Sequence, residues 1–465
     1  MPKGLGWLGV VGPGVIVLGA AIGGGEFLLG PAAFVRYGFS LLWITAVAVF
    51  LQTIFNTELM RYTLATGEPV FTGFMRTRPS STLWGWVYAF LFILQLGWPA
   101  WAANAAAAAF FLFTKRLPEG ADANAVYLIG VGTFLVCVTI LLFGRRIERT
   151  LEFLNAILIV CILGSFTVLA VVFVPVTIWI AATAGFAGFS IEQRGFDFLP
   201  QNADFFLLGA LAAYSGAGGV ANVVLSNWAR DRGYGMGQRT GFIPAAVGGK
   251  KVNVAHSGFI FTPDADSMRR WRGWWNVVRA DQWGVFFVGA ILGMMLPAML
   301  YVNFLPAGSD IRGLGIAAAL ANAIGSQSGP LLAGFIAFLG VWLLFKSQLD
   351  LLEATVRVVT DLLWTGSVRI RSWRGGDVRA LYYSVLVIVV IWGMIALRLA
   401  QPIVLLQIGA NIAGVTFVIA GAHLLYINTR LLPLELRPPT WRRACLVAMM
   451  LFYSFFSVLS VRSLL

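Results

Sequence analysis

The stretch that decides the fold is Gly19-Ala20-Ala21-Ile22-Gly23-Gly24-Gly25-Glu26-Phe27, in the middle of the first long apolar segment. Each interior glycine costs a helix about 1 kcal/mol relative to alanine. Three consecutive glycines followed by a carboxylate predict a break in a membrane-spanning helix, and such a break is tolerated where protein or a cavity satisfies the backbone. The alternative is a helix whose glycines only allow close packing against a neighbour.

The amino-acid composition distinguishes a membrane protein from a water-soluble one. Apolar residues make up 59% of its 465 residues and charged residues 11%, against about 45–50% and about 25% in soluble domains. So few charges could not cover the surface of a soluble protein of this size. We therefore predict an all-α polytopic membrane protein, and exclude a soluble enzyme and a disulfide-rich secreted domain.

Eleven apolar segments are long enough to cross a bilayer, which takes about 20 residues each. They cover approximately 10–36, 40–60, 83–113, 124–144, 151–174, 205–227, 284–305, 331–353, 380–399, 403–428 and 444–461. The sixth is also glycine-dense at its centre, over Ala213–Asn222. Broken helices one and six, five spans apart, predict two inverted five-helix repeats with the substrate site where the breaks meet.

One transmembrane domain, 1–465, is expected, with repeat one over about 10–174, repeat two over about 205–428 and an additional helix over about 444–461. Placing the N-terminus in the cytoplasm puts 26 of the 33 Lys and Arg residues on the cytoplasmic side and 7 outside. We therefore expect a multi-pass plasma (inner) membrane protein with its C-terminus outside. The cytoplasmic loop 228–283 is basic and rich in tryptophan, and we interpret it as a segment on the inner leaflet.

Charges inside spans are costly, and they persist where they are paired, hydrated or functional. Glu26 is the clearest case, and Lys346 in the eighth span is the second. Lys346 and Asp350 are an i,i+4 pair. We expect Lys346 to face the first helix with Glu26 or Asp350 as its partner; the alternative is an internal Lys346–Asp350 salt bridge with only a folding role. His423 in the tenth span is either a proton relay or a hydrogen-bonded helix residue.

The candidate site follows from these patterns. Glu26 is the expected metal ligand. The residues expected to bind the substrate are Gly23, Gly24, Gly25, Glu26, Ser215, Gly216, Ala217, Gly218 and Asn222. The residues expected to serve coupling or charge relay are Lys346, Ser347, Gln348, Asp350 and His423. Weaker polar candidates within spans are Gln52, Gln95, Asn104, Asn155, Gln407 and Asn411.

No catalytic residues and no bound cofactor are expected. The segment Gly4–Gly9 fits G-x-G-x-x-G without a surrounding βαβ unit, and Gly248–Lys251 lacks the Ser/Thr and upstream Gly of a P-loop. The expected partners are membrane lipid, the transported ion or solute and a coupling H⁺ or Na⁺, with no nucleic acid. The sequence does not define the oligomeric state, and a monomer is compatible with it.

Residues 12–43 resemble the natural resistance-associated macrophage protein (Nramp) family of divalent-metal transporters. Gly12-Pro13-Gly14, then Gly23–Glu26, then Tyr37-Gly38-Phe39-Ser40-Leu41-Leu42-Trp43 are similar to that family's opening, and Tyr426–Arg430 is similar in character. The resemblance implies the leucine-transporter-like fold of the amino acid–polyamine–organocation superfamily. It also implies proton-coupled import of Mn²⁺ or Fe²⁺.

The departures from the family lie on its metal ligands. Gly23 stands where the family has Asp and Glu26 where it has Asn, and the sixth helix has Ala217-Gly218-Gly219 near the family's Met-Pro-His. One carboxylate, amides and carbonyls suit hard cations better than soft metals. Metal-cation transport is therefore the first hypothesis. A small organic, amino acid-like solute is the second, and a non-transporting membrane sensor or scaffold is the third.

Overall fold

The computed structural model describes residues 1–2, 12–143, 147–240 and 258–465. Apart from one hairpin of β1 (Phe189–Ser190) and β2 (Gly195–Phe196), the regular elements of these residues are helical. The first half contains α1 (Pro13–Gly24), α2 (Gly30–Tyr37), α3 (Leu42–Thr66), α4 (Val70–Phe74), α5 (Ser81–Leu96), α6 (Ala100–Thr114), α7 (Ala123–Phe143), α8 (Ile147–Phe173) and α9 (Val176–Gly185).

The second half begins with the short helices of the sixth span and ends with three long ones. It contains α10 (Phe205–Tyr214), α11 (Val220–Asp231), α12 (Gly237–Thr240), α13 (Ala265–Arg279), α14 (Val288–Phe304), α15 (Ile316–Ser328), α16 (Pro330–Gly366), α17 (Val368–Arg371), α18 (Val378–Ala396), α19 (Pro402–Arg430) and α20 (Thr440–Arg462).

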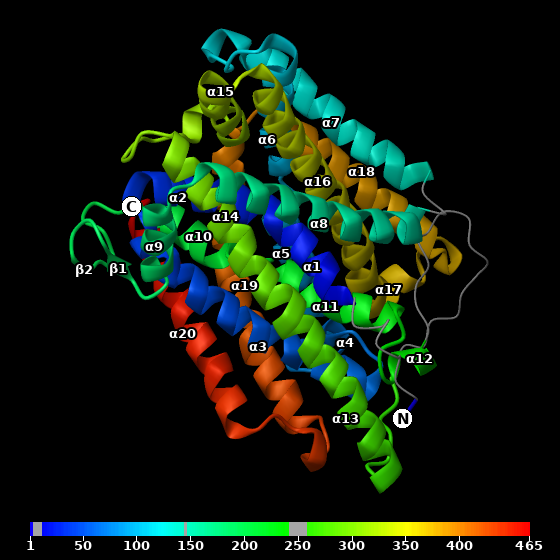
Figure 1. Cartoon of the computed structure of the whole chain (residues 1–465). Helices are drawn as coiled ribbons and strands as arrows, with labels where there is room; N and C mark the ends of the chain where they lie inside the picture. Colours follow the sequence, from blue (N-terminus) through cyan, green and yellow to red (C-terminus); the bar gives the residue numbers. More distant parts are fainter. Residues whose placement is uncertain (3–11, 144–146, 241–257) are drawn as a thin grey trace.

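The eleven predicted spans are all present as helices. Nine helical segments of the described chain are long and apolar enough to cross a membrane, and α8 and the pair α10–α11 fill the other two positions. Figure 1 shows the N-terminus near α12 and α13 and the C-terminus near α2 and α9, at opposite ends of the bundle, as an odd number of spans requires. The chain is a multi-pass membrane protein.

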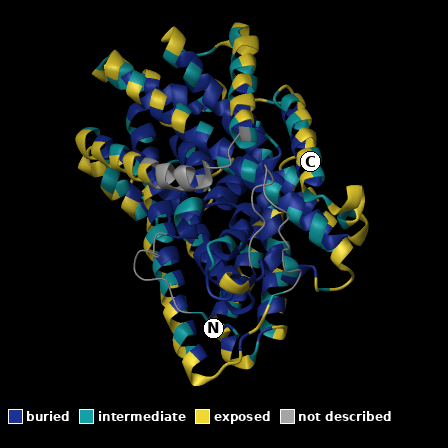
Figure 2. Ribbon diagram, turned by 90° about the vertical axis from the view of Figure 1, so that its right-hand side faces the viewer, coloured by how far each residue is buried: buried dark blue, intermediate teal, exposed yellow. Residues whose placement is uncertain are grey.

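The outer surface of the bundle is apolar. Figure 2 shows buried residues concentrated in its interior, with exposed residues along the outer faces of the helices. Many of these exposed side chains are hydrophobic, among them Val168, Val171 and Val172 on α8 and Leu451 and Val458 on α20. Such a surface is stable against lipid tails rather than water.

The sixth span is broken, as predicted. Helix α10 ends at Tyr214 and α11 begins at Val220. Between them the backbone takes positive φ at Gly216 (101°), Gly218 (86°) and Gly219 (49°). L-residues rarely adopt this conformation, whereas glycine does so without steric cost. The glycines of this span therefore form a true interruption.

The first span is irregular at the predicted place, but the irregularity is a π-helical turn and not an open segment like that of span six. Helix α1 continues through Gly24 into a π-helical turn over Gly25–Leu29, and α2 follows at once from Gly30. The amide N–H of Gly30 donates to the carbonyl oxygen of Gly25, as a π-turn requires. Hydrogen bonding therefore persists through the glycine run, and the helix is widened rather than opened.

The basic loop also differs from the interpretation as a segment on the inner leaflet. Its helix α13 runs without interruption into the seventh span through a π-helical segment, Ala280–Phe287. Trp271 and Trp274 are buried within the protein, against Phe261 and Tyr234 respectively. The tryptophans therefore belong to a helical extension of span seven, and residues 241–257 of the loop lie outside the described residues.

Candidate functional site

The π-helical turn of span one meets the break of span six around Glu26. The amide N–H of Gly216 donates to Glu26 Oε1 at 3.1 Å, and the side chain of Glu26 is fully buried. A methyl group on Gly25 would overlap the carbonyl oxygen of Tyr214, at the end of α10. The two glycine-rich segments are therefore in direct backbone contact, with the carboxylate at their junction.

The second carboxylate oxygen of Glu26 has no partner. Glu26 Oε2 is buried and accepts no hydrogen bond from any described residue. Over the same residues, no Lys, Arg or His lies within salt-bridge distance of Glu26, and its methylene carbons lie beside Gly293 of α14. An unpaired carboxylate oxygen in a buried position is costly unless a ligand or proton satisfies it. Glu26 therefore has one oxygen fixed by the protein and one available.

Three polar side chains hold the broken backbone of span six. Gln52 Nε2 donates to the carbonyl oxygen of Ser215 at 2.6 Å, and Thr45 Oγ1 lies 3.1 Å from Ser215 Oγ. Gln95 Nε2 donates to the Gly218 carbonyl at 2.9 Å, and Gln95 Oε1 accepts from the Val220 amide at 3.0 Å. Gln52 and Gln95, weak candidates in the sequence, thus satisfy the groups that the break releases.

Asn222 lies against α3, with its Oδ1 lacking a partner among the described residues, and Ala217 lies within the break of span six. Asn222 Nδ2 donates to Gln52 Oε1 at 3.2 Å and to Asn56 Oδ1 at 2.9 Å, so its amide is engaged with α3 rather than with Glu26. Ala217 is buried in the break between Gly216 and Gly218. The structure thus brings Ser215, Gly216 and their neighbours to Glu26, and turns Asn222 toward the supporting layer.

The other two glycines of the run face neighbouring helices. A methyl group on Gly23 would overlap Ser347 Oγ on α16, and one on Gly24 would lie 3.0 Å from Trp101 Nε1 on α6. Ser347 donates to the Leu343 carbonyl at 3.0 Å. Trp101 is buried, and its indole N–H has no acceptor among the described residues. The glycine run therefore lets α16 and α6 approach span one beside Glu26.

Lys346 faces span one, as expected, and its partner is Asp350. Lys346 Nζ lies 2.8 Å from Asp350 Oδ2, and both side chains are almost fully buried. A methyl group on Gly19 of α1 would overlap Lys346 Nζ. Gln348 lies between Lys346 and Asp350 in the sequence, and its Oε1 accepts a hydrogen bond from the Ala102 amide at 3.2 Å. Gln348 is thus engaged in joining α16 to α6.

His423 lies apart from this group. Its Nδ1 is 2.6 Å from Tyr88 Oη, and its ring packs against Trp84 and Phe74. In the described part of the chain, none of these four residues forms a hydrogen bond or ion pair with Glu26 or Lys346. The arrangement is that of a hydrogen-bonded helix residue, the alternative to a relay.

The sequence patterns missed several buried carboxylates, of which Asp281 and Glu58 are fully buried. Asp281, on the π-helical segment before α14, accepts from the amides of Gly12 (3.2 Å) and Gly14 (2.9 Å) at the start of α1. Glu58 on α3 is held by Arg61 (2.7 Å) and by Arg442 of α20 (2.9 Å). Asp281 lies within the expected loop 228–283, and Glu58 lies near the end of an expected span, so neither position indicated a buried site.

Replacing Asp281 with Ala is expected to destabilise the protein. The change removes the acceptor of two backbone N–H groups at the positive end of α1, and a lost hydrogen bond to a charged group costs about 1.5–3 kcal/mol. Thermal melts in detergent should show a lower melting temperature, with a smaller decrease for Asp281→Asn, which keeps one carbonyl acceptor. Equal melting temperatures for Asp281→Ala and the parent would contradict this role.

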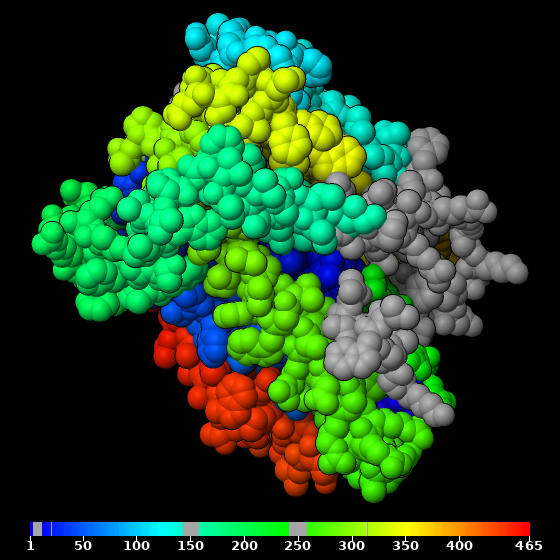
Figure 3. All heavy atoms as spheres, in the orientation of Figure 1, coloured from blue at the N-terminus to red at the C-terminus, as the bar shows by residue number. Residues whose placement is uncertain are grey.

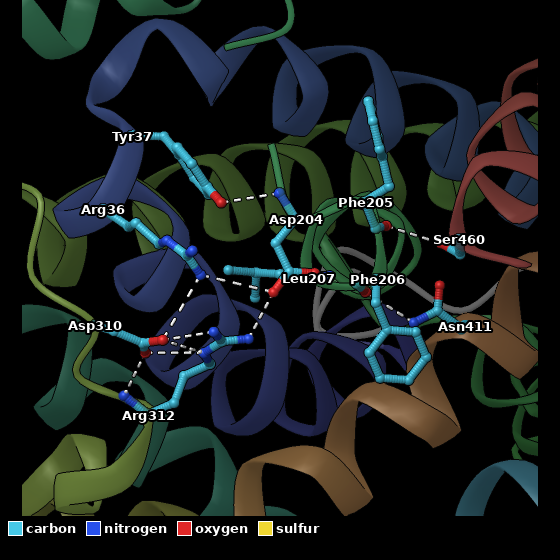
Figure 4. A network of polar contacts seen from close by, with 10 residues as sticks. All are labelled: Arg36, Tyr37, Asp204, Phe205, Phe206, Leu207, Asp310, Arg312, Asn411 and Ser460. Carbon is cyan, nitrogen blue, oxygen red and sulfur yellow. Dashed lines mark hydrogen bonds and ion pairs between the residues drawn. The ribbon is translucent and has the colours of Figure 1, made fainter. Parts of the chain in front are cut away.

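A charged network joins one end of span one to one end of span six, at the end of the bundle that holds the C-terminus. Asp204 caps α10 and lies 2.7 Å from Arg312 Nη1 and 3.7 Å from Arg36 Nη1, and Arg36 also lies 3.6 Å from Asp310 (Figure 4). The hydroxyl of Tyr37 accepts from the Asp204 amide at 2.8 Å. The loop between α14 and α15 is thereby tied to α2 and α10.

Acid is expected to weaken this network. Hydrogen bonding to Arg312 holds the pKa of Asp310 at about 2, below its ordinary 3.8. Because the folded pKa is the lower one, the contribution of Asp310 to stability is present above pH 4 and is lost as the pH falls toward 2. The melting-temperature difference between the parent and Asp310→Asn should therefore shrink between pH 5 and pH 2.5. The difference is small because Asp310 is half-exposed, and a difference independent of pH would refute the assignment.

Comparisons with known proteins agree with this architecture. No known protein-family profile matches the chain. A curated relative, the divalent metal cation transporter MntH of Chromohalobacter salexigens, is 30% identical over 166 residues, which is 36% of this chain and 36% of that protein. The matched region thus spans about a third of the relative's length.

Solved structures match over the whole chain. A variant of the Eremococcus coleocola manganese transporter has a TM-score of 0.67 at 16% identity, with 100% of this chain and 89% of that chain covered. A nucleobase-cation-symport-1 family transporter with bromovinylhydantoin bound has a TM-score of 0.52 at 13% identity, with 98% and 91% covered. The leucine-transporter-like fold is therefore confirmed.

Proposed function

We propose that this chain is a secondary-active transporter of a divalent metal cation, with Glu26 as the anionic ligand. The observation that carries the proposal is the free, buried Oε2 of Glu26 at the junction of spans one and six. Substrates of inverted-repeat transporters bind where discontinuous helices meet. The similarity to MntH and to a manganese transporter supports a metal as the cargo.

The ligand set favours a hard cation. Over the described residues, no group of three or more His, Cys, Asp or Glu side chains could hold a metal ion. Glu26 would act with backbone carbonyl oxygens near the break of span six and with waters that the ion retains. Such oxygen ligands suit Mn²⁺, Mg²⁺ and Ca²⁺ better than soft metals. We therefore expect weak discrimination among these three ions.

A small organic solute is the second candidate, and Trp101 favours it. The free indole N–H of Trp101 is a donor, so it cannot bind a bare cation but can bind an anionic or carbonyl group of a solute. The glycine run beside it leaves side-chain-free backbone at this wall of the site. Glu26 would then bind an amine, as expected for an amino acid-like substrate.

Purified protein in liposomes distinguishes these functions. Uptake of Mn²⁺, measured with an internal metal-sensitive dye, is expected to exceed that of protein-free liposomes. A thermal-shift screen of Mn²⁺, Mg²⁺ and Ca²⁺ against amino acids and organic acids should show stabilisation by the metals, because a ligand stabilises the state it binds. Stabilisation by an organic solute alone would support the second candidate, and flux of neither class would favour a sensor or scaffold.

The predicted orientation is part of the proposal. With the N-terminus in the cytoplasm, the far ends of α11 and α16 face the cytoplasm and the network around Asp204 faces the outside. A cysteine introduced near the C-terminus should then react with an impermeant maleimide added to intact cells. Protection of that cysteine in intact cells and labelling after lysis would invert the assignment.

A further inference from the structure

Trp101 presents a hydrogen-bond donor without a partner close to the carboxylate of Glu26. Its side chain is 3% exposed, and its indole N–H has no acceptor among the described residues. A methyl group on Gly24 would lie 3.0 Å from Trp101 Nε1, so this edge of the ring lies against the backbone two residues before Glu26. A buried donor that lacks an acceptor is costly. The site thus contains one donor and, at Glu26 Oε2, one acceptor that both need a ligand.

These two groups border the same part of the site. The ring centroids of Trp101 and Tyr214 lie 6.1 Å apart, and a methyl group on Gly25 would overlap the Tyr214 carbonyl oxygen. Helix α6, which carries Trp101, therefore lies beside the junction of spans one and six. The indole N–H and the free carboxylate oxygen come from different spans, and they flank the same short stretch of span one.

A divalent cation alone would satisfy only one of the two groups. It can bind Glu26 Oε2, whereas the indole nitrogen is a donor only and cannot coordinate a metal. With one carboxylate ligand, the ion also keeps one uncompensated positive charge, which is costly inside a membrane. In the part of the chain that the structure describes, no group of three or more His, Cys, Asp or Glu side chains supplies further ligands. An anionic hydrogen-bond acceptor would satisfy the donor and neutralise the charge.

We propose that the site binds its divalent cation together with a small carboxylate-type anion, which Trp101 holds by a hydrogen bond. Such an anion has two oxygens, so one can coordinate the metal while the other accepts from the indole N–H. The cation, Glu26 and the anion then form a neutral unit. Acetate and bicarbonate share this planar O–C–O group. The inference rests on the proposed function, because the anion binds next to the transported cation.

The test measures Mn²⁺ binding to the full-length protein in detergent at pH 7.5. The binding buffer contains perchlorate, acetate or bicarbonate at equal ionic strength and equal free Mn²⁺, with perchlorate as the weakly coordinating reference. Acetate or bicarbonate should strengthen Mn²⁺ binding by about tenfold, which lies within the usual coupling between two ligands. By reciprocity, Mn²⁺ should strengthen binding of that anion by the same factor. The anion that gives the larger effect identifies the preferred co-ligand.

The substitution Trp101→Phe assigns the effect to the indole N–H, because it keeps an aromatic ring and removes the donor. The ratio of Mn²⁺ affinities in acetate and in perchlorate should fall from about ten to about one. Trp392→Phe is the matched control. The Trp392 indole N–H also lacks an acceptor among the described residues, but its ring lies on α18 against Trp98. This variant should keep the parental ratio.

Two results would overturn the anion site while leaving the proposed function intact. The first is an equal Mn²⁺ affinity of the parent in all three buffers. The second is an enhancement by acetate that persists in folded Trp101→Phe. Acetate that binds the parent equally well with and without Mn²⁺ would replace the co-ligand by an independent organic solute, and would also overturn the proposal. Absence of Mn²⁺ binding in every buffer would instead refute the proposed function, and the co-ligand with it.

Discussion

Glu26→Gln should abolish metal-dependent flux and weaken Mn²⁺ binding at least about thirtyfold. Removing one partner of a buried charged contact costs about 2–5 kcal/mol, and about 1.4 kcal/mol corresponds to a tenfold change in affinity. Glutamine has the same length and can still accept the hydrogen bond from the Gly216 amide, so the junction of spans one and six should persist. Thermal-shift titration with Mn²⁺ and liposome uptake measure the two effects.

The matched control is Glu192→Gln. Glu192 lies exposed in the turn between β1 and β2, so this change removes the same charge far from the junction. Binding and uptake should remain at parental values. Unaltered Mn²⁺ affinity and flux in a folded Glu26→Gln protein would remove the carboxylate from the transport site.

Gly25→Ala should eliminate transport for a steric reason. The added methyl group would occupy the position of the Tyr214 carbonyl oxygen, so the π-helical turn Gly25–Leu29 and α10 could not approach as they do. Overpacking of this kind costs about 1–3 kcal/mol, and here the obstacle is backbone, which cannot move aside as a side chain can. Liposome uptake measures the loss, and size-exclusion chromatography shows whether the protein remains folded.

Gly132→Ala is the control for this substitution. Gly132 lies on an exposed face of α7, and a methyl group there would meet no described atom within 4 Å. Uptake by this variant should equal that of the parent. Normal uptake by Gly25→Ala would show that the contact with Tyr214 is dispensable for the transport cycle.

The architecture could be predicted from the sequence because lipid imposes strong constraints. The length of each span and the placement of charge follow from bilayer thickness and the cost of burying charge. The break of span six was predictable for a local reason, since three of its glycines occupy conformations that other residues avoid.

The conformation of span one was not predictable in the same way. Glycines lower the preference for helix, but they do not decide between an open segment and a widened turn. The close contact of Gly25 with Tyr214 and the retained hydrogen bond from Gly30 to Gly25 depend on residues that meet only in the folded protein. Local sequence therefore located the irregularity without defining its geometry.

The polar residues in and around the site also divide into those that local sequence predicts and those that depend on distant partners. The Lys346–Asp350 pair could be predicted because helix geometry places residues four apart side by side. Asp281 was missed because its partners, Gly12 and Gly14, lie more than 260 residues away in the chain. Gln52 and Gln95 stood out as polar residues in apolar spans, but only the fold shows that they bind the backbone of the break.

Span one is accessible from one face of the molecule. Figure 3 shows atoms of α1 at the bottom of a hollow between α8 and α14, while the elements around it cover the rest of this view. Helix α1 also packs against α16 and α11. The helix that leads into the Glu26 turn is thus bordered by several neighbours and accessible from one face.

The π-helical turn at Gly25–Leu29 would allow the end of span one beyond it to rotate. Such a turn holds one residue more than an α-helical turn. If that residue were absorbed into regular helix, everything beyond it would rotate by about 100° and advance by about 1.5 Å. Glu26 would then point to a different neighbour, and Arg36 would swing away from Asp204 and Asp310. This one backbone rearrangement would break the ion pairs of Arg36 and change the direction of the Glu26 carboxylate at the same time.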